Sequence, residues 1–384
     1  MDRRLQLRYW RLVREHRHVL NAAAAGITAL PGVAEPFACA QAMWRFLHNP
    51  RAGPAALMEP VVEAVRAMAG DGPDLLVALD WSMLHFGGHA SKGDRHRRTH
   101  AADPGYELAC ALAVDAGSGL PMGPLELRLR ADGGDASTRR GGPGPAEGRL
   151  DGVAATMRSA ADLLGRRPVF VIDREADSVG CFRAWHAAGF RFLVRADDAR
   201  VVLREGRPRC GGWKLPEVAD DLFAPGAEVV EAGPIEYEKE PARLQVAEAA
   251  VVLDRPARRT AAGRTSGGNK RQVEVPGPPL PLRLVVARVV DARGAVKARW
   301  LLLSNVERPG PDGCDAATPA RWYYLRWRIE SFFLLLKSSG CQVEEWGQRD
   351  AEAVLRRLVV ASMACVCAST SVPRPPRSAA SWCG

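Results

Sequence analysis

The sequence predicts an α/β protein in which helices flank a mixed β-sheet. Short apolar runs of the kind that form buried strands recur between residues 75 and 304, and helical segments follow several of them. Helical patterns dominate the two ends of the chain, residues 1–70 and 350–369. With 384 residues, the chain is long enough for two domains and a sizeable core.

The composition is that of a soluble globular protein, and its positive charge favours an anionic partner, although many basic proteins bind none. Apolar residues make up 47% of the chain and charged residues 25%, and no apolar run reaches the length that spans a membrane. The net charge of +9 favours a partner such as nucleic acid. Nine scattered cysteines without a C-x2-C pair argue against a zinc knuckle and indicate reduced thiols in a cytosolic protein.

Residues 1–70 form a predicted helical N-terminal region, for which DNA binding is one interpretation. Arg4, Arg8 and Arg11 recur at helical spacing and therefore share one face. Such a face can contact DNA phosphates or can simply be solvated, and the spacing leaves both alternatives open. Asn49 and Pro50 then end a helix and begin a turn.

The first predicted strand is the apolar run LLVALD, residues 75–80, which ends in Asp80. Buried aspartates are rare unless they are paired, hydrogen-bonded or bound to metal, so Asp80 is a candidate functional residue. The next predicted elements are strands at 107–115 and 124–130 joined by a turn at 117–119, a mobile Gly-rich surface loop at 131–148, and an amphipathic helix at 150–164.

A second acid follows a second apolar run, in the segment PVFVIDREADS. Residues 169–172 are predicted to form a strand that Asp173 ends, and a helix is expected to begin at Asp177. The plain alternative is a polar strand-to-helix loop with an N-cap. However, three acids around Arg174 exceed what capping requires. The next strand, RFLVR, ends in Arg195.

Residues 196–299 are expected to form a β-rich insertion, with strand-like runs at 227–231, 242–253 and 282–291. Within it, residues 255–271 carry six Lys or Arg and no acid, which predicts a flexible basic loop. Contact with DNA phosphates and plain solvation both remain possible for this loop. The run WLLLS, which begins at Trp300, returns to a core strand, and residues 371–384 are expected to be a disordered tail.

The segment WYYLRWRIESFFLLLK, residues 322–337, is predicted to be one helix. Its residues Tyr323, Arg326, Glu330 and Lys337 fall within an arc of about 60° on that helix. One carboxylate between two cations and a phenol suits a bound metal with phosphates beside it. A solvated face with a Glu–Arg pair at i,i+4 is the alternative that the spacing leaves open.

The order of elements is three strands, helix, strand, helix, strand, insertion, strand and helix, which is ribonuclease-H-like. In that fold Asp80, Asp173 and Glu330 would meet at one point. Three carboxylates repel one another in a partly dry site, and divalent metal removes that conflict. Mg²⁺ prefers hard oxygen ligands, and two such ions can activate water or a DNA 3′-hydroxyl for attack on a phosphodiester.

The motifs D-W-S, D-R-E-A-D, F-L-V-R, W-L-L-L-S and Y-x2-R-x3-E-x6-K occur in one order along the chain. Together they resemble the IS-four family of bacterial insertion-sequence transposases, the DDE group that includes the Tn-five transposase. The resemblance covers about residues 40–370. It implies a ribonuclease-H-like catalytic domain at 71–370, interrupted by a β-rich insertion at about 196–299.

The resemblance also implies an activity, namely cut-and-paste DNA transposition by metal-dependent hydrolysis and strand transfer. The metal would be Mg²⁺, which Mn²⁺ can replace, held by Asp80, Asp173 and Glu330. The partners would be double-stranded DNA at the element ends and the target, bound by a homodimer in the cytoplasm at the nucleoid. The DNA- or phosphate-binding residues would be Tyr323, Arg326, Lys337, Arg174, Arg195 and Trp300.

Trp300 matches a tryptophan that, in the Tn-five transposase, stacks on a base flipped out of the transposon end. An aromatic pocket for an extruded base is physically reasonable. A core tryptophan is the alternative.

Three other functions compete with transposition. Both terminal regions are shorter than the family leads us to expect, so a truncated, inactive transposase that only binds DNA is one alternative. A metal-dependent nuclease on the same fold would use the same acids. A zinc hydrolase would need His85, His89, His96 and His100, but the glycines between these residues would break any helix that presented them.

Overall fold

The computed structural model describes residues 1–18, 36–70, 74–97, 103–140, 142–264, 270–307, 314–339 and 341–370. It confirms a mixed α/β architecture, with a large mixed sheet and flanking helices. The chain divides into two compact units: Met1–Arg167 with Trp327–Gly384, and Pro168–Arg326. No helix among the described residues is long and apolar enough to cross a membrane.

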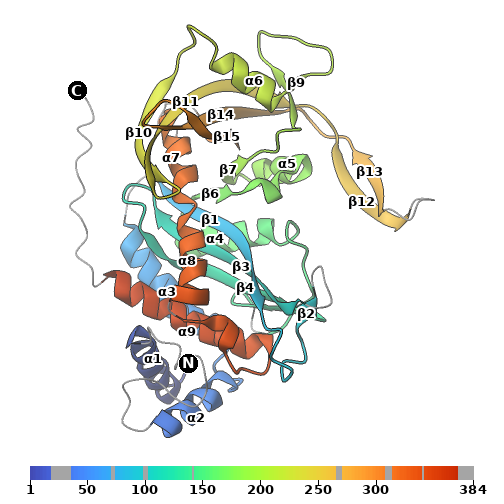
Figure 1. Ribbon diagram of the computed structural model, residues 1–384. Coiled ribbons are helices and arrows are strands. Elements are labelled where there is room, and N and C mark those ends of the chain that lie inside the picture. Colours follow the sequence, from blue (N-terminus) through green and yellow to red (C-terminus); the bar gives the residue numbers. More distant parts are fainter. Residues whose placement is uncertain are drawn as a thin grey trace. The chain divides into compact units, whose positions relative to one another are not determined.

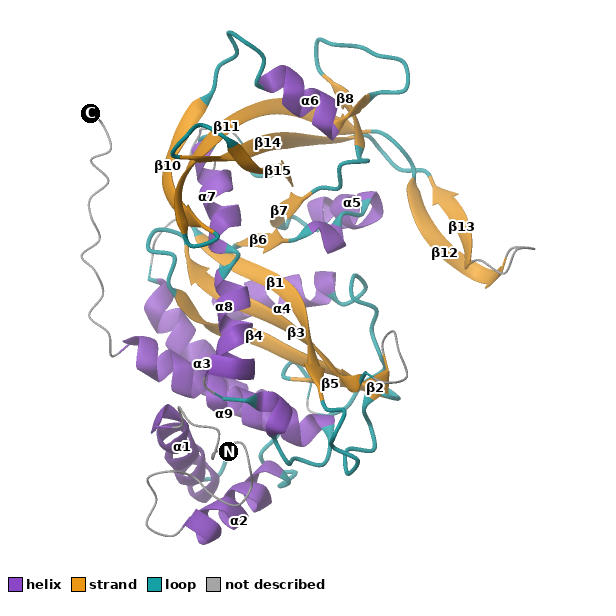
Figure 2. Ribbon diagram, viewed as in Figure 1, coloured by secondary structure: helices purple, strands orange, loops and turns teal. Residues whose placement is uncertain are grey.

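The first unit contains antiparallel strands in the order β5-β4-β3-β1, with β2 paired to β3 (Figure 2). Their bounds are β1 Leu75–His85, β2 His96–Arg97, β3 Pro104–Asp115, β4 Pro121–Ala131 and β5 Gly134–Ser137.

The prediction that β1 ends at Asp80 is wrong, because the strand continues to His85. Its second half pairs with β3 from Trp81 opposite Ala109 to His85 opposite Gly105. A Cβ at Gly105 would come 1.9 Å from the Leu84 carbonyl oxygen, so glycine permits this close pairing. Asp80 therefore lies in the middle of a paired strand.

The described part of the first unit contains the α-helices α1 Arg3–His18, α2 Pro36–Leu47, α3 Pro54–Ala69, α4 Val153–Leu164, α8 Arg328–Leu334 and α9 Ala351–Thr370. Helices α3 and α9 pack against β4 and against each other, and α1 packs on α9. A Cβ at Gly123 of β4 would lie 2.7 Å from Val366 and 3.1 Å from Val65, so this glycine allows the close approach of both helices. The predicted domain boundary at residue 70 remains a prediction.

The second unit contains a sheet in the order β6-β7-β15-β14-β11-β8-β9, with β10 on β11. Strands β6 and β7 are parallel, and β15 joins β7 antiparallel, so that β14, β11, β8 and β9 extend this sheet beyond β15. The strands are β6 Val169–Ile172, β7 Arg191–Arg195, β8 Val201–Arg204, β9 Trp213–Lys214, β10 Val230–Tyr237, β11 Glu240–Leu253, β14 Leu280–Asp291 and β15 Val296–Ser304, and the helices are α5 Val179–Ala187, α6 Leu215–Leu222 and α7 Ala317–Leu325.

The predicted basic loop at 255–271 is largely a β-hairpin of β12 (Ala257–Arg264) and β13 (Lys270–Val275), shown in Figure 1; residues 265–269 lie outside the described part of the chain. Arg183 of α5 holds the base of this hairpin. Its guanidinium donates to the carbonyls of Leu253, Arg255 and Pro278, at 3.4, 3.1 and 2.8 Å. Backbone pairing between β12 and β13 and the hydrogen bonds from Arg183 explain why a Gly- and Arg-rich segment is folded.

The prediction of a mobile loop at 131–148 is also wrong for the described residues of that segment. It contains β5, and Asp135, Ser137 and Thr138 are buried. The Thr138 hydroxyl accepts from the Leu127 N–H at 3.0 Å, which fastens the segment to β4.

Candidate functional site

Asp173 follows the four buried residues of β6 and occupies the N-cap of a short 3₁₀ helix, Arg174–Ala176. Its carboxylate accepts from the Arg174 N–H at 2.8 Å. The capping role that the sequence left open is therefore real. It uses only part of the carboxylate, because a carboxylate has two oxygens that accept several hydrogen bonds.

Three further side chains surround the same carboxylate. The Tyr323 hydroxyl donates to Asp173 Oδ1 at 3.0 Å. Arg326 Nη2 lies 3.8 Å from Oδ2, and Arg195 Nη1 lies 4.0 Å from Oδ1. We call Asp173, Arg195, Tyr323 and Arg326 the Asp173 cluster. The end of β6, the end of β7 and the last turn of α7 thus supply one site inside the second unit.

The cluster keeps Asp173 ionised and Tyr323 protonated. Burial alone would raise the pKa of the Asp173 carboxyl, but the Arg326 guanidinium, the Arg174 N–H, Tyr323 and Arg195 together lower it below its ordinary value. Burial raises the pKa of Tyr323 to about 12. The phenol therefore remains a hydrogen-bond donor to a charged carboxylate at neutral pH.

The Asp173 cluster carries one negative and two positive charges, and only part of it reaches solvent. Arg326 and Tyr323 are buried, at 3% and 1% exposure. The side chains of Asp173 and Arg195 are 30% and 34% exposed. The partly exposed Arg195 guanidinium can accept a phosphate, and the buried Arg326 adds positive charge beside the ionised carboxylate. Arg174 is exposed beside it.

Trp300 is buried, at 2% exposure, with its ring centroid 5.3 Å from that of Tyr323. Its ring thus lies against the Tyr323 phenol inside the core. This agrees with the alternative interpretation, in which Trp300 is a core residue. Stacking on an extruded base stays a prediction.

The single helix predicted for residues 322–337 is wrong. Helix α7 ends at Leu325, α8 begins at Arg328, and Leu335–Ser339 is a π-helix. The Glu330 N–H bonds to the Trp327 carbonyl only three residues back, and a π-turn holds more residues than an α-turn, so the regular 100° spacing is lost. Tyr323 and Arg326 belong to the second unit, and Glu330 and Lys337 to the first.

In the first unit, Asp80 is half-buried and accepts from the Trp81 N–H at 2.8 Å. It lies opposite Cys110, and burial together with the Asp80 charge raises the pKa of the Cys110 thiol. Glu330 is exposed on α8, which packs on β1 and β3.

The Lys337 ammonium donates to the Met83 carbonyl of β1 and lies 3.8 Å from Glu344. It is therefore tied to the strand that carries Asp80.

Among the described residues, no group of three or more His, Cys, Asp or Glu side chains is arranged to hold a metal ion. Asp80 and Glu330 belong to the first unit and Asp173 to the second, so the predicted metal trio stays a prediction. Of the alternative zinc ligands, His85 pairs with Asp103 at 2.5 Å and His100 lies outside the described residues.

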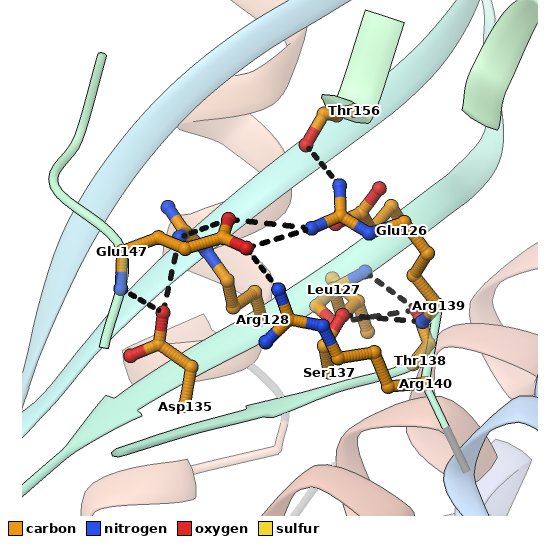
Figure 3. Close-up of polar contacts among 10 residues, drawn as sticks. All are labelled: Glu126, Leu127, Arg128, Asp135, Ser137, Thr138, Arg139, Arg140, Glu147 and Thr156. Carbon is orange, nitrogen blue, oxygen red and sulfur yellow. Dashed lines mark hydrogen bonds and ion pairs between the residues drawn. The ribbon is translucent and has the colours of Figure 1, made fainter. Parts of the chain in front are cut away.

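Sequence reasoning missed a second charged group, in the first unit. We call it the Glu147 cluster; it consists of Glu126, Arg128, Asp135, Arg139, Arg140 and Glu147 (Figure 3). Arg128 Nη1 lies 3.1 Å from Asp135 Oδ2 and 3.2 Å from Glu147 Oε2. The alternation of Glu126 and Arg128 in the predicted strand was the available signal, because it places both on one face.

Through Arg139, the Glu147 cluster also joins β4 to α4. Arg139 lies 3.4 Å from Glu126 Oε1 and donates to the Thr156 hydroxyl at 3.5 Å. Beside it lies a small cavity of about 20 Å³, lined partly by Glu126, Arg128 and Thr156. That volume suffices for about one water molecule.

No protein-family model matches the chain, and no curated protein matches it.

Proposed function

We propose that this protein is a DDE-type DNA transposase that cuts and joins DNA strands by metal-dependent phosphodiester chemistry. The observation that carries the proposal is the Asp173 cluster. An acid that was singled out from the sequence is ionised there, and a phenol and two guanidiniums of the same predicted site surround it. The resemblance of the ordered motifs to the IS-four family supports the same conclusion.

In this proposal Asp80, Asp173 and Glu330 hold Mg²⁺ in the working complex with DNA. The donor set fits, because all three are hard carboxylate oxygens and the cluster keeps Asp173 ionised. When bound, the metal would supply charge stabilisation at the reacting phosphate and a stronger oxygen nucleophile. Arg195 binds a neighbouring phosphate, and the buried Arg326 and Tyr323 orient the Asp173 carboxylate.

The ribonuclease-H-like fold is part of the proposal. Two arrangements that such a sheet contains support it: antiparallel β4-β3-β1 in the first unit and parallel β6-β7 in the second. The partners are double-stranded DNA at the element ends and the target, bound by a homodimer at the bacterial nucleoid. Arg174, Lys337 and Trp300 complete the proposed DNA contacts.

The test is a gel assay with labelled, pre-cut ends of the element that encodes the chain, a plasmid target and Mg²⁺. A transposase gives covalently joined end–target products, and Asp173→Asn gives none. Cleavage without joining by protein shown to be dimeric on DNA would favour a nuclease that uses the same acids. DNA binding with neither reaction would favour an inactive transposase that only binds DNA.

A further inference from the structure

Two cysteines of the first unit, Cys341 and Cys365, come together from different elements. Cys341 follows the π-helix Leu335–Ser339, and its N–H donates to the Leu335 carbonyl at 3.1 Å. Cys365 lies in the second half of α9. Both are half-buried cysteines that form no disulfide in the structure.

Backbone and ring contacts hold the Cys341 segment against α9. The Trp346 indole N–H donates to the Cys341 carbonyl at 2.7 Å. The same indole stacks on the guanidinium of Arg357 of α9, at 4.2 Å from the ring centroid. Arg357 is 1% exposed and also donates to Gln348 at 3.2 Å. The position of Cys341 therefore follows from a packed arrangement that does not depend on its sulfur.

The thiols of Cys341 and Cys365 are hydrogen-bonded to each other, with the Arg357 guanidinium close by. The hydrogen bond from Cys365 and the charge of Arg357 lower the pKa of the Cys341 thiol against the effect of burial. The same hydrogen bond and burial raise the pKa of Cys365. Cys341 is thus the thiol that ionises first, and the thiolate is the reactive form of cysteine.

We propose that Cys341 and Cys365 are a peroxide-sensitive pair that closes to a disulfide. The Cys341 thiolate attacks a peroxide oxygen, so that an S–O bond forms, the O–O bond breaks and hydroxide leaves. The Cys365 thiol then attacks the sulfenic sulfur, the S–S bond forms, and water leaves with the Cys365 proton. The two thiols are oxidised by two electrons, and the peroxide is reduced to water.

The disulfide would join the segment that follows Lys337 to α9. Lys337 itself donates a hydrogen bond to the Met83 carbonyl of β1. The disulfide would therefore add a covalent link between α9 and the segment that holds this lysine. This inference does not depend on the proposed function. Thiol chemistry is its primary readout, so it can fail or hold separately from DNA cleavage.

The test uses the full-length reduced protein treated briefly with hydrogen peroxide, blocked with iodoacetamide and digested without reductant. We expect mass spectrometry to find the Cys341 and Cys365 peptides linked, two hydrogens lighter than the separate thiols, and released by dithiothreitol. Cys210, an exposed thiol of the second unit, serves as the internal control for general oxidation.

Two variants define the order of the steps. In Cys365→Ser, a dimedone probe should trap sulfenic acid at Cys341 faster than at Cys210. In Cys367→Ser, the matched control two residues further along α9, the disulfide should still form. Linked peptides that are absent from the wild type while Cys210 oxidises would overturn the proposal. Dimedone labelling of Cys341 no faster than Cys210, in variant protein with a normal circular dichroism spectrum, would also overturn it.

Discussion

The Asp173 cluster and the Glu147 cluster both set acids among arginines, but only one of them is balanced in charge. The Glu147 cluster has three acids and three arginines, and Arg128 and Arg139 lie 3.1 to 3.4 Å from its acids. The Asp173 cluster has one acid and two arginines, at 3.8 and 4.0 Å. The side chain of Asp135 is fully buried, whereas that of Asp173 is 30% exposed.

The difference separates a structural network from a candidate binding site. Buried ions must be closely paired, because an unpaired charge in the interior is costly. The short, balanced pairs of the Glu147 cluster meet that requirement and join β4, β5 and α4. In the Asp173 cluster Arg326 is also buried, but Arg195 and Asp173 reach solvent and the net charge is positive. The exposed Arg195 therefore suits a second anion from solution, which is a DNA phosphate in the proposed function.

Among the changes that test the difference between the two clusters, removal of the metal should have the largest effect. We expect cleavage of element-end DNA in Mg²⁺ or Mn²⁺, with complete loss in excess chelator and no support from Ca²⁺, because the proposed ligands are all carboxylates. Product formation in each ion, measured on a denaturing gel, checks this. Full activity in chelator would remove the reason for placing a metal at Asp173.

The next largest effect concerns folding. Asp135→Ala should lower the free energy of unfolding by about 1–3 kcal/mol, because it leaves the buried Arg128 with Glu147 alone and the Glu147 N–H without its acceptor. Urea denaturation measures the change, and Glu59→Ala, which removes an exposed acid of the same unit, should stay within about 0.5 kcal/mol of wild type. Equal stability of both variants would mean that the Glu147 cluster does not hold the strands.

The two clusters should also respond to pH in opposite directions. The folded pKa of Asp173 is lowered below 3.8, so its contribution to stability is present above that pH and is lost as the pH falls through the folded value. Burial, only partly offset by Arg139 and Arg128, raises the folded pKa of Glu126 above 4.5, so its contribution is lost as the pH rises through the folded value.

Unfolding curves of wild type, Asp173→Asn and Glu126→Gln across acidic and neutral pH test these signs. Relative to wild type, Asp173→Asn should be least stable towards neutral pH, whereas Glu126→Gln should gain. Parallel curves for the two variants would contradict the electrostatic difference between the clusters.

The smallest effect is on the salt dependence of DNA binding. Arg195→Ala should reduce the slope of log affinity against log salt by about one unit, the loss of one phosphate contact. Arg140→Ala is the matched control, since its guanidinium is already paired with Glu147 and is 28% exposed. Fluorescence anisotropy at several salt concentrations gives the slope for each variant. Equal slopes for Arg195→Ala and Arg140→Ala would mean that Arg195 contacts no phosphate.

The local sequence pattern predicted those strands whose length depends only on neighbouring residues in the sequence. The apolar runs of β6 and β7 lie between polar residues, and both strands have the predicted bounds. The second half of β1 could not be predicted in this way, because its length is set by pairing with β3. The break between α7 and α8 lies where the chain passes from one unit to the other, and the absence of Gly and Pro around Arg326 and Trp327 gives no sign of it.

The same limit applies to the sites. Tyr323 and Asp173 are 150 residues apart in sequence, so their hydrogen bond is a product of the fold, although both had been singled out by motif. The Glu147 cluster was missed because glycine-rich composition indicated a loop. Its partners, such as Arg128 and Glu147, interact across 19 residues that carry no periodic pattern.

Cleavage of element-end DNA in Mg²⁺ by Asp80→Ala, Asp173→Ala and Glu330→Ala, with Glu126→Gln as the control acid, tests the central claim most directly. The account predicts that each of the three alanine variants loses at least about a thousandfold in rate, since a catalytic metal stabilises the transition state by several kcal/mol. Folding and DNA binding should be retained, and Glu126→Gln should cleave at close to the wild-type rate. Near-normal cleavage by any of the three alanine variants would contradict the assignment of that acid as a metal ligand.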